Sequence, residues 1–217
     1  MRRVVLPWAA IVILAVAVLV AGWLTPPQPA SVGSDTLGPD NGEVVADYLA
    51  RAAAGLDAAE AEPGDLEHWG LASFAVPVGI DEVLALADEV RVGQILFRVP
   101  IERVQTPLVP VAVPQNHEAL RRAPSVAASR LSMMQFGTER AARVAAVSAK
   151  RLAAGCECVV GVVVRGTPTQ LRSVADDPTV RAVEILPADA VAGRFSVTPL
   201  LPTHVDRVVP GPDDGEP

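Results

Sequence analysis

The two cysteines of this chain, Cys156 and Cys158, are the residues with the most readily interpreted chemistry. Structural zinc needs four ligands, and no second cysteine pair is present to complete a site. Redox couples of the thioredoxin type use C-x-x-C at the start of a helix, whereas this pair precedes an apolar run typical of a strand. In an oxidising compartment two neighbouring thiols tend to pair. We therefore expect a local disulfide, for which Gly155 permits the necessary bend, while two buried thiols or a bridge to a second copy stay open as alternatives.

The histidines and the standard catalytic motifs predict no active site. His68, His117 and His204 show no H-x-x-x-H or related ligand spacing. The chain also lacks a G-x-S-x-G elbow, a phosphate-binding glycine loop and a Ser-x-x-Lys pattern. We therefore expect no catalytic residue, no cofactor, no metal site and no enzymatic activity.

Two groups of charged residues could still converge in space. One is a set of carboxylates around Pro63-Gly64, where a solvated loop is the simpler interpretation: Glu60, Glu62, Asp65 and Glu67. The other is the pair Arg91 and Arg181, which hold equivalent positions in an internal repeat described below. They could form a symmetric anion site, but exposed arginines paired with nearby carboxylates are the commoner arrangement.

The N-terminal segment predicts a membrane anchor over residues 1–24. Residues 4–24 form an uncharged run of 21 residues, and about 20 apolar residues span a bilayer core as a helix. Trp8 and Trp23 lie near its two ends, where indole rings favour the membrane interface. Arg2 and Arg3 predict a cytoplasmic N-terminus, with the rest of the chain outside. A cleaved signal peptide is the alternative, and the spacing of Ala17 and Ala21 leaves a weak homodimer open.

Composition indicates how the remainder is organised and which partners it excludes. Residues 25–42 are rich in Pro, Gly and Ser and predict a flexible linker. Residues 206–217 predict a disordered acidic tail, which leaves an extracytoplasmic α/β domain over 43–205. Beyond the anchor, 16 basic residues face 25 acidic ones, a net charge of −9. Because the arginines are also spread singly, we expect no binding to nucleic acid.

An internal duplication is the strongest pattern in the predicted domain. Two strand–helix–strand units, about 71–98 and 159–186, share four identities in seven positions between "VRVGQIL" and "VRAVEIL". Val83 and Leu171 become equivalent buried helix positions, and Ile95 and Ile185 equivalent strand positions. Two such units predict an α+β fold, a ferredoxin-like sandwich with a four-stranded sheet and helices on one face.

Shorter patterns predict the other elements. Residues 43–54 have the apolar spacing of a helix behind Asp40 and Asn41 as caps, and the proline-rich residues 99–116 predict an extended segment. Residues 125–154 carry small and apolar residues at alternating spacings of three and four, which predicts one long inserted helix. Thr167, Pro168 and Gln170 predict a capping box at the start of the second repeat helix.

The order of an apolar strand, G-T-P-x-Q-L-x-x-x-A and D-P-x-V-R-x-V-E resembles the second half of subtilisin-type propeptides and related stand-alone protease inhibitors. The resemblance covers residues 159–187. It implies a ferredoxin-like domain that binds a separate protease through its sheet and a C-terminal extension. The whole layout also resembles single-pass anchored proteins of high-GC Gram-positive bacteria, a resemblance that implies no activity.

Together these observations predict a membrane-anchored extracytoplasmic interaction or regulatory module without catalytic activity. Its expected partners are the membrane, through residues 4–24, and an extracytoplasmic protein. A protease inhibitor of the subtilisin-propeptide type is the first alternative, and an enzyme of another class is the second.

Overall fold

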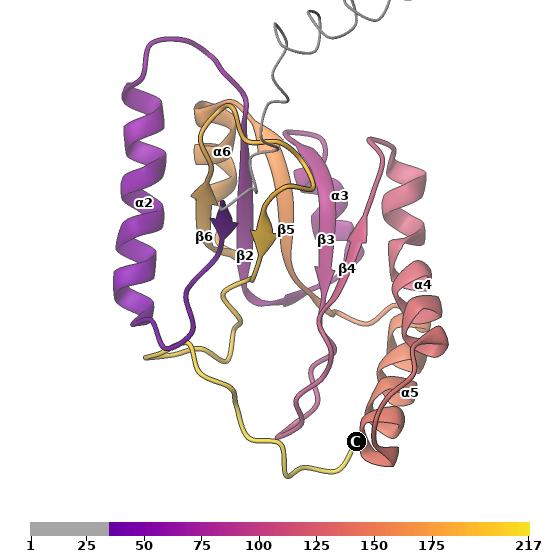
Figure 1. The fold of residues 1–217 in the computed structure, drawn as a ribbon. Coiled ribbons are helices and arrows are strands. Elements are labelled where there is room, and N and C mark those ends of the chain that lie inside the picture. Colours follow the sequence, from indigo (N-terminus) through magenta and orange to yellow (C-terminus); the bar gives the residue numbers. More distant parts are fainter. Residues whose placement is uncertain (1–34) are drawn as a thin grey trace, which may run out of the picture. The chain divides into compact units, whose positions relative to one another are not determined.

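A five-stranded antiparallel sheet is the centre of the computed structural model, which describes residues 35–217 (Figure 1). The strand order is β4-β3-β5-β2-β6. The bounds of the strands are β2 His68–Val78, β3 Arg91–Phe97, β4 Val109–Ala112, β5 Val159–Gly166 and β6 Val180–Ile185. The predicted α+β class is confirmed.

The predicted anchor over 1–24, with Trp8 and Trp23, and the first part of the predicted linker lie outside the described residues. Among residues 35–217, no helix is both long enough and apolar enough to cross a bilayer.

The two repeat units interleave in the sheet. Helix α3 (Ile80–Leu86) connects β2 to β3, and α6 (Pro168–Ala175) connects β5 to β6. Each pair of connected strands has one strand of the other unit between them, so β2 and β5 are neighbours at the centre. Central strands are covered on both faces, which is why β5 is buried over nearly its whole length.

The repeat helices begin as the sequence predicts. Thr167 caps α6, accepting a hydrogen bond from the backbone N–H of Gln170, whose side chain in turn accepts one from the N–H of Thr167. Helix α3 follows Gly79, which contributes no side-chain cap. Val83 and Leu171 are both fully buried in the main core cluster, so their predicted equivalence is confirmed.

The strands of the two units correspond less closely, because the shifts in their pairing register fall at different positions. The pairing of β3 with β5 shifts between Val92 and Gln94, whereas the pairing of β6 with β2 shifts at Phe74. Val92 therefore packs in the main core cluster, while the equivalent Ala182 packs in another cluster with Tyr48. A one-residue shift changes the face on which a side chain lies, and this is why the repeat is only approximate.

The two faces of the sheet carry separate cores. The main cluster joins the sheet to α3, α6 and the inserted helices. The second cluster includes Leu37, Trp69, Leu71 and Leu201. It lies under a two-stranded parallel pair, β1 (Thr36–Leu37) with β7 (Ser196–Val197), which Figure 1 shows in front of the sheet.

The predicted linker over 25–42 is wrong for residues 36–42. Leu37 is 1% exposed and belongs to the second core cluster. Helix α2 (Val45–Ala61) begins after Val44, which makes no side-chain cap hydrogen bond, so Asp40 and Asn41 are not its caps. Packing of β1 on the sheet therefore draws this Pro- and Gly-rich segment into the domain.

The predicted single helix over 125–154 is also wrong. Two helices occupy the region, α4 (His117–Met133) and α5 (Glu139–Ala153). Thr138 starts α5 by accepting a hydrogen bond of 3.1 Å from the N–H of Ala141. Gly137 just before it disfavours a continuous helix, and the side-chain cap stabilises a new start instead. Within the predicted extended segment, Val109–Ala112 forms the edge strand β4.

The residues that we expected to form a disordered tail make defined contacts. Val208 is 5% exposed and packs beside α2. Asp213 and Asp214 form ion pairs with Arg140 and Arg103. These oppositely charged residues are more than 70 positions apart in the chain, and their pairing holds the C-terminal segment in place. Because the partners are so distant, the composition of the segment alone does not reveal the pairing.

Candidate functional site

Two adjoining cavities lie beside the loop after β3 in the part of the chain that the structure describes. Their volumes are about 640 and 450 Å³. The loop after β3 and the segment after β7 line both cavities, and residues 36–41 and 208–212 complete the larger one. The shared lining residues are Arg98, Ile101, Arg103, Val104, Leu201 and Thr203. Sites of this size with a few polar groups among apolar walls are typical of ligand binding.

Arg98 is the charged side chain common to both cavities that lacks an ionic partner. It follows β3 directly, between Phe97 and Val99, which are 1% and 2% exposed. Its backbone N–H donates to the carbonyl oxygen of Cys158 at 2.8 Å, which fixes the start of the loop against β5. Burial lowers the pKa of the guanidinium. Among residues 35–217 no carboxylate pairs with it and no side-chain acceptor binds it.

His204 provides a neutral donor beside this charge. The ring is 8% exposed, and its Nδ1 lies 3.3 Å from the N–H of Leu201, from which it accepts a hydrogen bond. A neutral ring in this arrangement carries its proton on Nε2. Burial lowers the pKa of His204, and the positive charges of Arg98 and Arg181 lower it further. The imidazole is therefore uncharged at neutral pH and offers one N–H group.

The chemistry of this site is that of an anion receptor. A half-buried guanidinium without a counter-ion has lost part of its hydration, and an entering carboxylate or phosphate group supplies the missing acceptors. Arg98 can donate two parallel hydrogen bonds to such a group. The apolar walls, such as Val104 and Leu201, suit the organic part of a ligand.

The structure places the disulfide next to this site. Cys156 and Cys158 are joined by a disulfide, with their Cα atoms 5.3 Å apart. Gly155 has a φ of +77°, the bend that the sequence suggested between α5 and β5. The carbonyl oxygen of Cys158 accepts a hydrogen bond from the N–H of Arg98. The disulfide therefore lies where the start of β5 meets the loop after β3, which lines the cavities.

The suggested arginine pair does not form a site. Arg91 lies over the ring of Trp69, 5.8 Å from its centroid, and Arg165 lies 5.7 Å from the same ring. Arg181 instead donates to the carbonyl oxygen of Leu201 at 3.2 Å. Neither Arg91 nor Arg181 pairs with a carboxylate within the described part of the chain, so the commoner alternative is wrong as well.

The histidines and the loop carboxylates are dispersed. His68 donates from Nδ1 to the carbonyl of Leu186, and His117 lies 3.3 Å from Asp88. The loop carboxylates Glu60 and Glu67 pair with different arginines, Arg172 and Arg165. Residues 35–217 contain no group of three or more potential metal ligands.

A buried ionic network ties the N-terminal segment to the sheet. Glu184, which is 6% exposed, accepts from the N–H of Gly38 and from the guanidinium of Arg51, which also pairs with Glu43 at 3.2 Å. Burial raises the pKa of Glu184, against the lowering effect of Gly38 and Arg51. Burial and the charge of Glu184 raise the pKa of Tyr48. Glu184 and Arg51 lie outside the lining of both cavities, so we assign this network a structural role.

No motif in the sequence marks Arg98 as a site residue. A signal was present, because Arg98 stands between apolar residues at the end of a strand run and directly before Val99-Pro100. His204 was considered only as a metal ligand, and the arginines near it in space come from the loop after β3 and from β6. Comparisons of the chain with protein-family models, with curated proteins and with solved structures each found no match.

Proposed function

We propose that the chain is a membrane-anchored extracytoplasmic interaction or regulatory module without catalytic activity, and that it binds an anionic group of its ligand at Arg98. The anchor is residues 4–24, the N-terminus is cytoplasmic and the domain is outside the cell membrane. The domain is a ferredoxin-like sandwich of two β-α-β units, extended by β4, α2, α4 and α5.

The observation that carries this proposal is a half-buried guanidinium without an ionic partner among the described residues, at the junction of two cavities. A protein gains nothing in stability from such a group, so binding is the better explanation of its placement. The bound chemistry is a carboxylate or a phosphate, presented by a small molecule or by a partner protein.

The environment of His204 supports binding over catalysis. A catalytic imidazole of the triad type donates from one nitrogen to a carboxylate that orients it. Nδ1 of His204 instead accepts from the backbone N–H of Leu201. Burial and the charges of Arg98 and Arg181, which lower its pKa, also make it a poor proton acceptor.

The principal partner is an extracytoplasmic protein, and a weak homodimer through the anchor remains part of the proposal. The negative charge of the exported part disfavours nucleic acid as a ligand.

The protease-inhibitor function is the second candidate, and the strand order of the sheet is compatible with it. The strands β6-β2-β5-β3 follow the order expected for a ferredoxin-like domain, as the resemblance implies. Inhibition of a secreted serine protease at submicromolar concentration would support this function, and failure across a broad protease panel would exclude it.

The test of anion binding compares two arginine variants. The melting temperature of residues 35–217 is measured with increasing phosphate and citrate. We expect a rise that follows ligand binding, that is lost in Arg98→Gln and that is kept in Arg91→Gln, a matched arginine that lies on Trp69 outside the cavities. Equal responses in the two variants would contradict the assignment of Arg98.

The test of the interaction function is crosslinking in intact membranes followed by affinity capture. We expect a specific extracytoplasmic protein, recovered less well with Arg98→Gln than with Arg91→Gln. Capture of no specific partner, together with turnover of a substrate by the purified domain, would contradict the proposal.

A further inference from the structure

Arg98 lies between two cavities whose linings differ in chemistry. The larger cavity, of about 640 Å³, is lined by many polar groups, among them Asp40, Asn41, Ser196 and His204. The smaller cavity, of about 450 Å³, is lined largely by apolar side chains and prolines, among them Val99, Pro100, Ile101, Val160, Leu201 and Pro202. An organic group attached to an anion at Arg98 can therefore extend into an apolar environment on one side.

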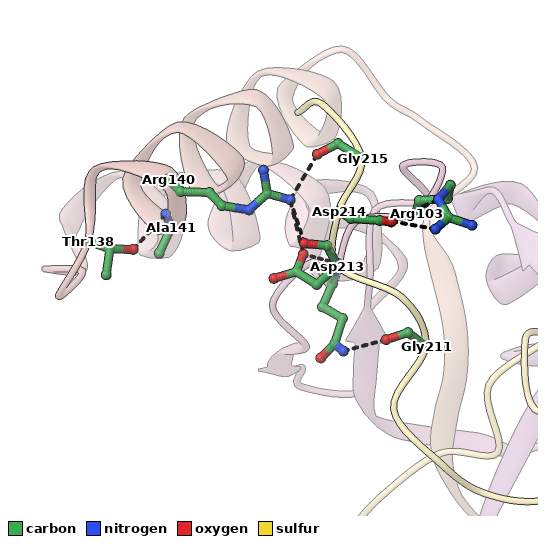
Figure 2. Close-up of polar contacts among 9 residues, drawn as sticks. Arg103, Thr138, Arg140, Ala141, Gly211, Asp213, Asp214 and Gly215 are labelled. Carbon is green, nitrogen blue, oxygen red and sulfur yellow. Dashed lines mark hydrogen bonds and ion pairs between the residues drawn. The ribbon is translucent and has the colours of Figure 1, made fainter.

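The other polar groups of the smaller cavity already have partners or face solvent. The hydroxyl of Thr106 donates a hydrogen bond of 2.7 Å to the carbonyl oxygen of Val99. The guanidinium of Arg103 pairs with Asp214, with Nε 2.8 Å from Oδ1 (Figure 2). The remaining polar residues of this lining are exposed to solvent: Glu102 and Thr203. Among residues 35–217, Arg98 is therefore the one part-buried polar side chain of the lining without a hydrogen-bond partner.

The charges in the two linings suit a ligand with a single negative charge. Arg98 contributes the guanidinium that lines both cavities without a carboxylate partner among the described residues. Glu102 adds a negative charge to the smaller lining, and Asp40 adds one to the larger lining. A doubly charged phosphate would therefore meet one uncompensated positive charge and two carboxylates. A carboxylate matches both the charge of Arg98 and the planar arrangement of its donors.

We propose that the ligand of Arg98 is a monocarboxylate with an apolar body, whose carboxylate binds the guanidinium and whose body lies in the smaller cavity. This inference rests on the anion binding proposed above. It narrows the anion to a carboxylate and the organic part to an apolar group. Two sources share this chemistry: a free carboxylic acid, and the C-terminus of a chain that ends in an apolar residue.

The experiment uses the full chain in phosphatidylcholine nanodiscs, with the methyl groups of valine and leucine labelled for NMR. The methyl resonances of Val104 and Leu201, which line both cavities, report binding. Acetate, butanoate and hexanoate are titrated, with hexanol and hexyl phosphate as controls for the head group. Equilibrium dialysis against protein-free nanodiscs gives the free ligand concentration and corrects for uptake by lipid.

We expect the affinity to rise about threefold to fourfold for each added methylene, because each one leaves water for the smaller cavity. Hexanol should bind about tenfold or more weakly than hexanoate, and hexyl phosphate should also bind more weakly. Arg98→Gln should weaken hexanoate binding about tenfold or more. Arg91→Gln is the matched control, because Arg91 lies on Trp69 and lines neither cavity.

A second pair of variants tests where the apolar body lies. Val160 and Val163 are both 2% exposed on β5 and belong to the same core cluster, but of the two Val160 lines the smaller cavity. Val160→Thr should weaken hexanoate binding about threefold or more and leave acetate unchanged, because a hydroxyl replaces a methyl group in the wall. Val163→Thr should leave both unchanged. Circular dichroism checks the fold, and the chain-length series on the unchanged chain needs no variant.

An affinity that stays the same from acetate to hexanoate would overturn the apolar body, while anion binding at Arg98 would stand. Tighter binding of hexyl phosphate than of hexanoate would overturn the carboxylate. Equal losses in Val160→Thr and Val163→Thr would overturn the placement in the smaller cavity. No response to any anion, phosphate and citrate included, would overturn this proposal and the anion binding together.

The two sources are separated by a further titration with the peptide acetyl-Ala-Leu and its C-terminal amide. The free peptide should bind about tenfold or more tightly than the amide, because the amide lacks the carboxylate. Tighter binding of the peptide than of hexanoate would assign the ligand to the end of a partner chain, and the reverse order would assign it to a free acid. Equal affinity of the peptide and its amide would contradict recognition of the carboxylate.

Discussion

Ile95 and Ile185, which the repeat predicts to be equivalent, differ in burial, and truncation of each to alanine tests this difference. Ile95 is 0% exposed and lies between Val111 of β4 and Val162 of β5. Ile185 is partly buried on the edge strand β6 and faces Gly70 of β2. The truncation removes three carbon atoms, at about 0.8 kcal/mol for each buried carbon, and leaves a cavity where the neighbours do not relax. We expect a loss in the free energy of unfolding of about 3–4 kcal/mol at Ile95 and about 1–2 kcal/mol at Ile185.

The measurement is urea denaturation of residues 35–217, followed by far-UV circular dichroism. If the slope of the free energy of unfolding against urea concentration is the same as in the unchanged chain, the variants and the unchanged chain unfold between comparable states. Ile95→Val and Ile185→Val are the matched controls, with smaller losses in the same order. A loss below about 0.5 kcal/mol at Ile95 would show that the strand register is wrong. A loss at Ile185 equal to that at Ile95 would refute the argument from the edge strand.

Three further predictions concern pH, the cysteines and topology. Burial, Arg98 and Arg181 lower the pKa of His204, so its imidazole binds a proton less tightly in the folded state than in the unfolded chain. The free energy of unfolding should therefore fall as the pH drops below about 6.5, and His204→Gln should reduce that fall. An equal fall in both proteins would contradict this. Non-reducing mass spectrometry should find Cys156 and Cys158 joined within one chain, whereas two alkylatable thiols or a covalent dimer would contradict the local disulfide. A C-terminal alkaline phosphatase fusion should be active, and an inactive but stable fusion would reverse the predicted orientation.

The elements that sequence alone predicted are those whose stabilising contacts are local. The capping box joins Thr167 to Gln170, three residues apart, and both partners can be seen in one short stretch. The apolar run of β5 and the buried positions Val83 and Leu171 follow from short-range periodicity. Gly155 next to the cysteines likewise indicated the bend between α5 and β5.

The features that the sequence did not show depend on partners far along the chain. Asp214 meets Arg103 across 111 residues, and Glu184 meets Gly38 across 146. Composition marked the two chain segments concerned as unable to pack, but long-range ion pairs and a few buried residues such as Leu37 hold them in place. The sequence determined the repeat and the local helices, because hydrogen bonds and periodicity within a few residues decide them. Only the tertiary structure decided that Arg98 is half-buried without a carboxylate partner, because burial and the absence of a counter-ion among the described residues depend on every element around the cavity.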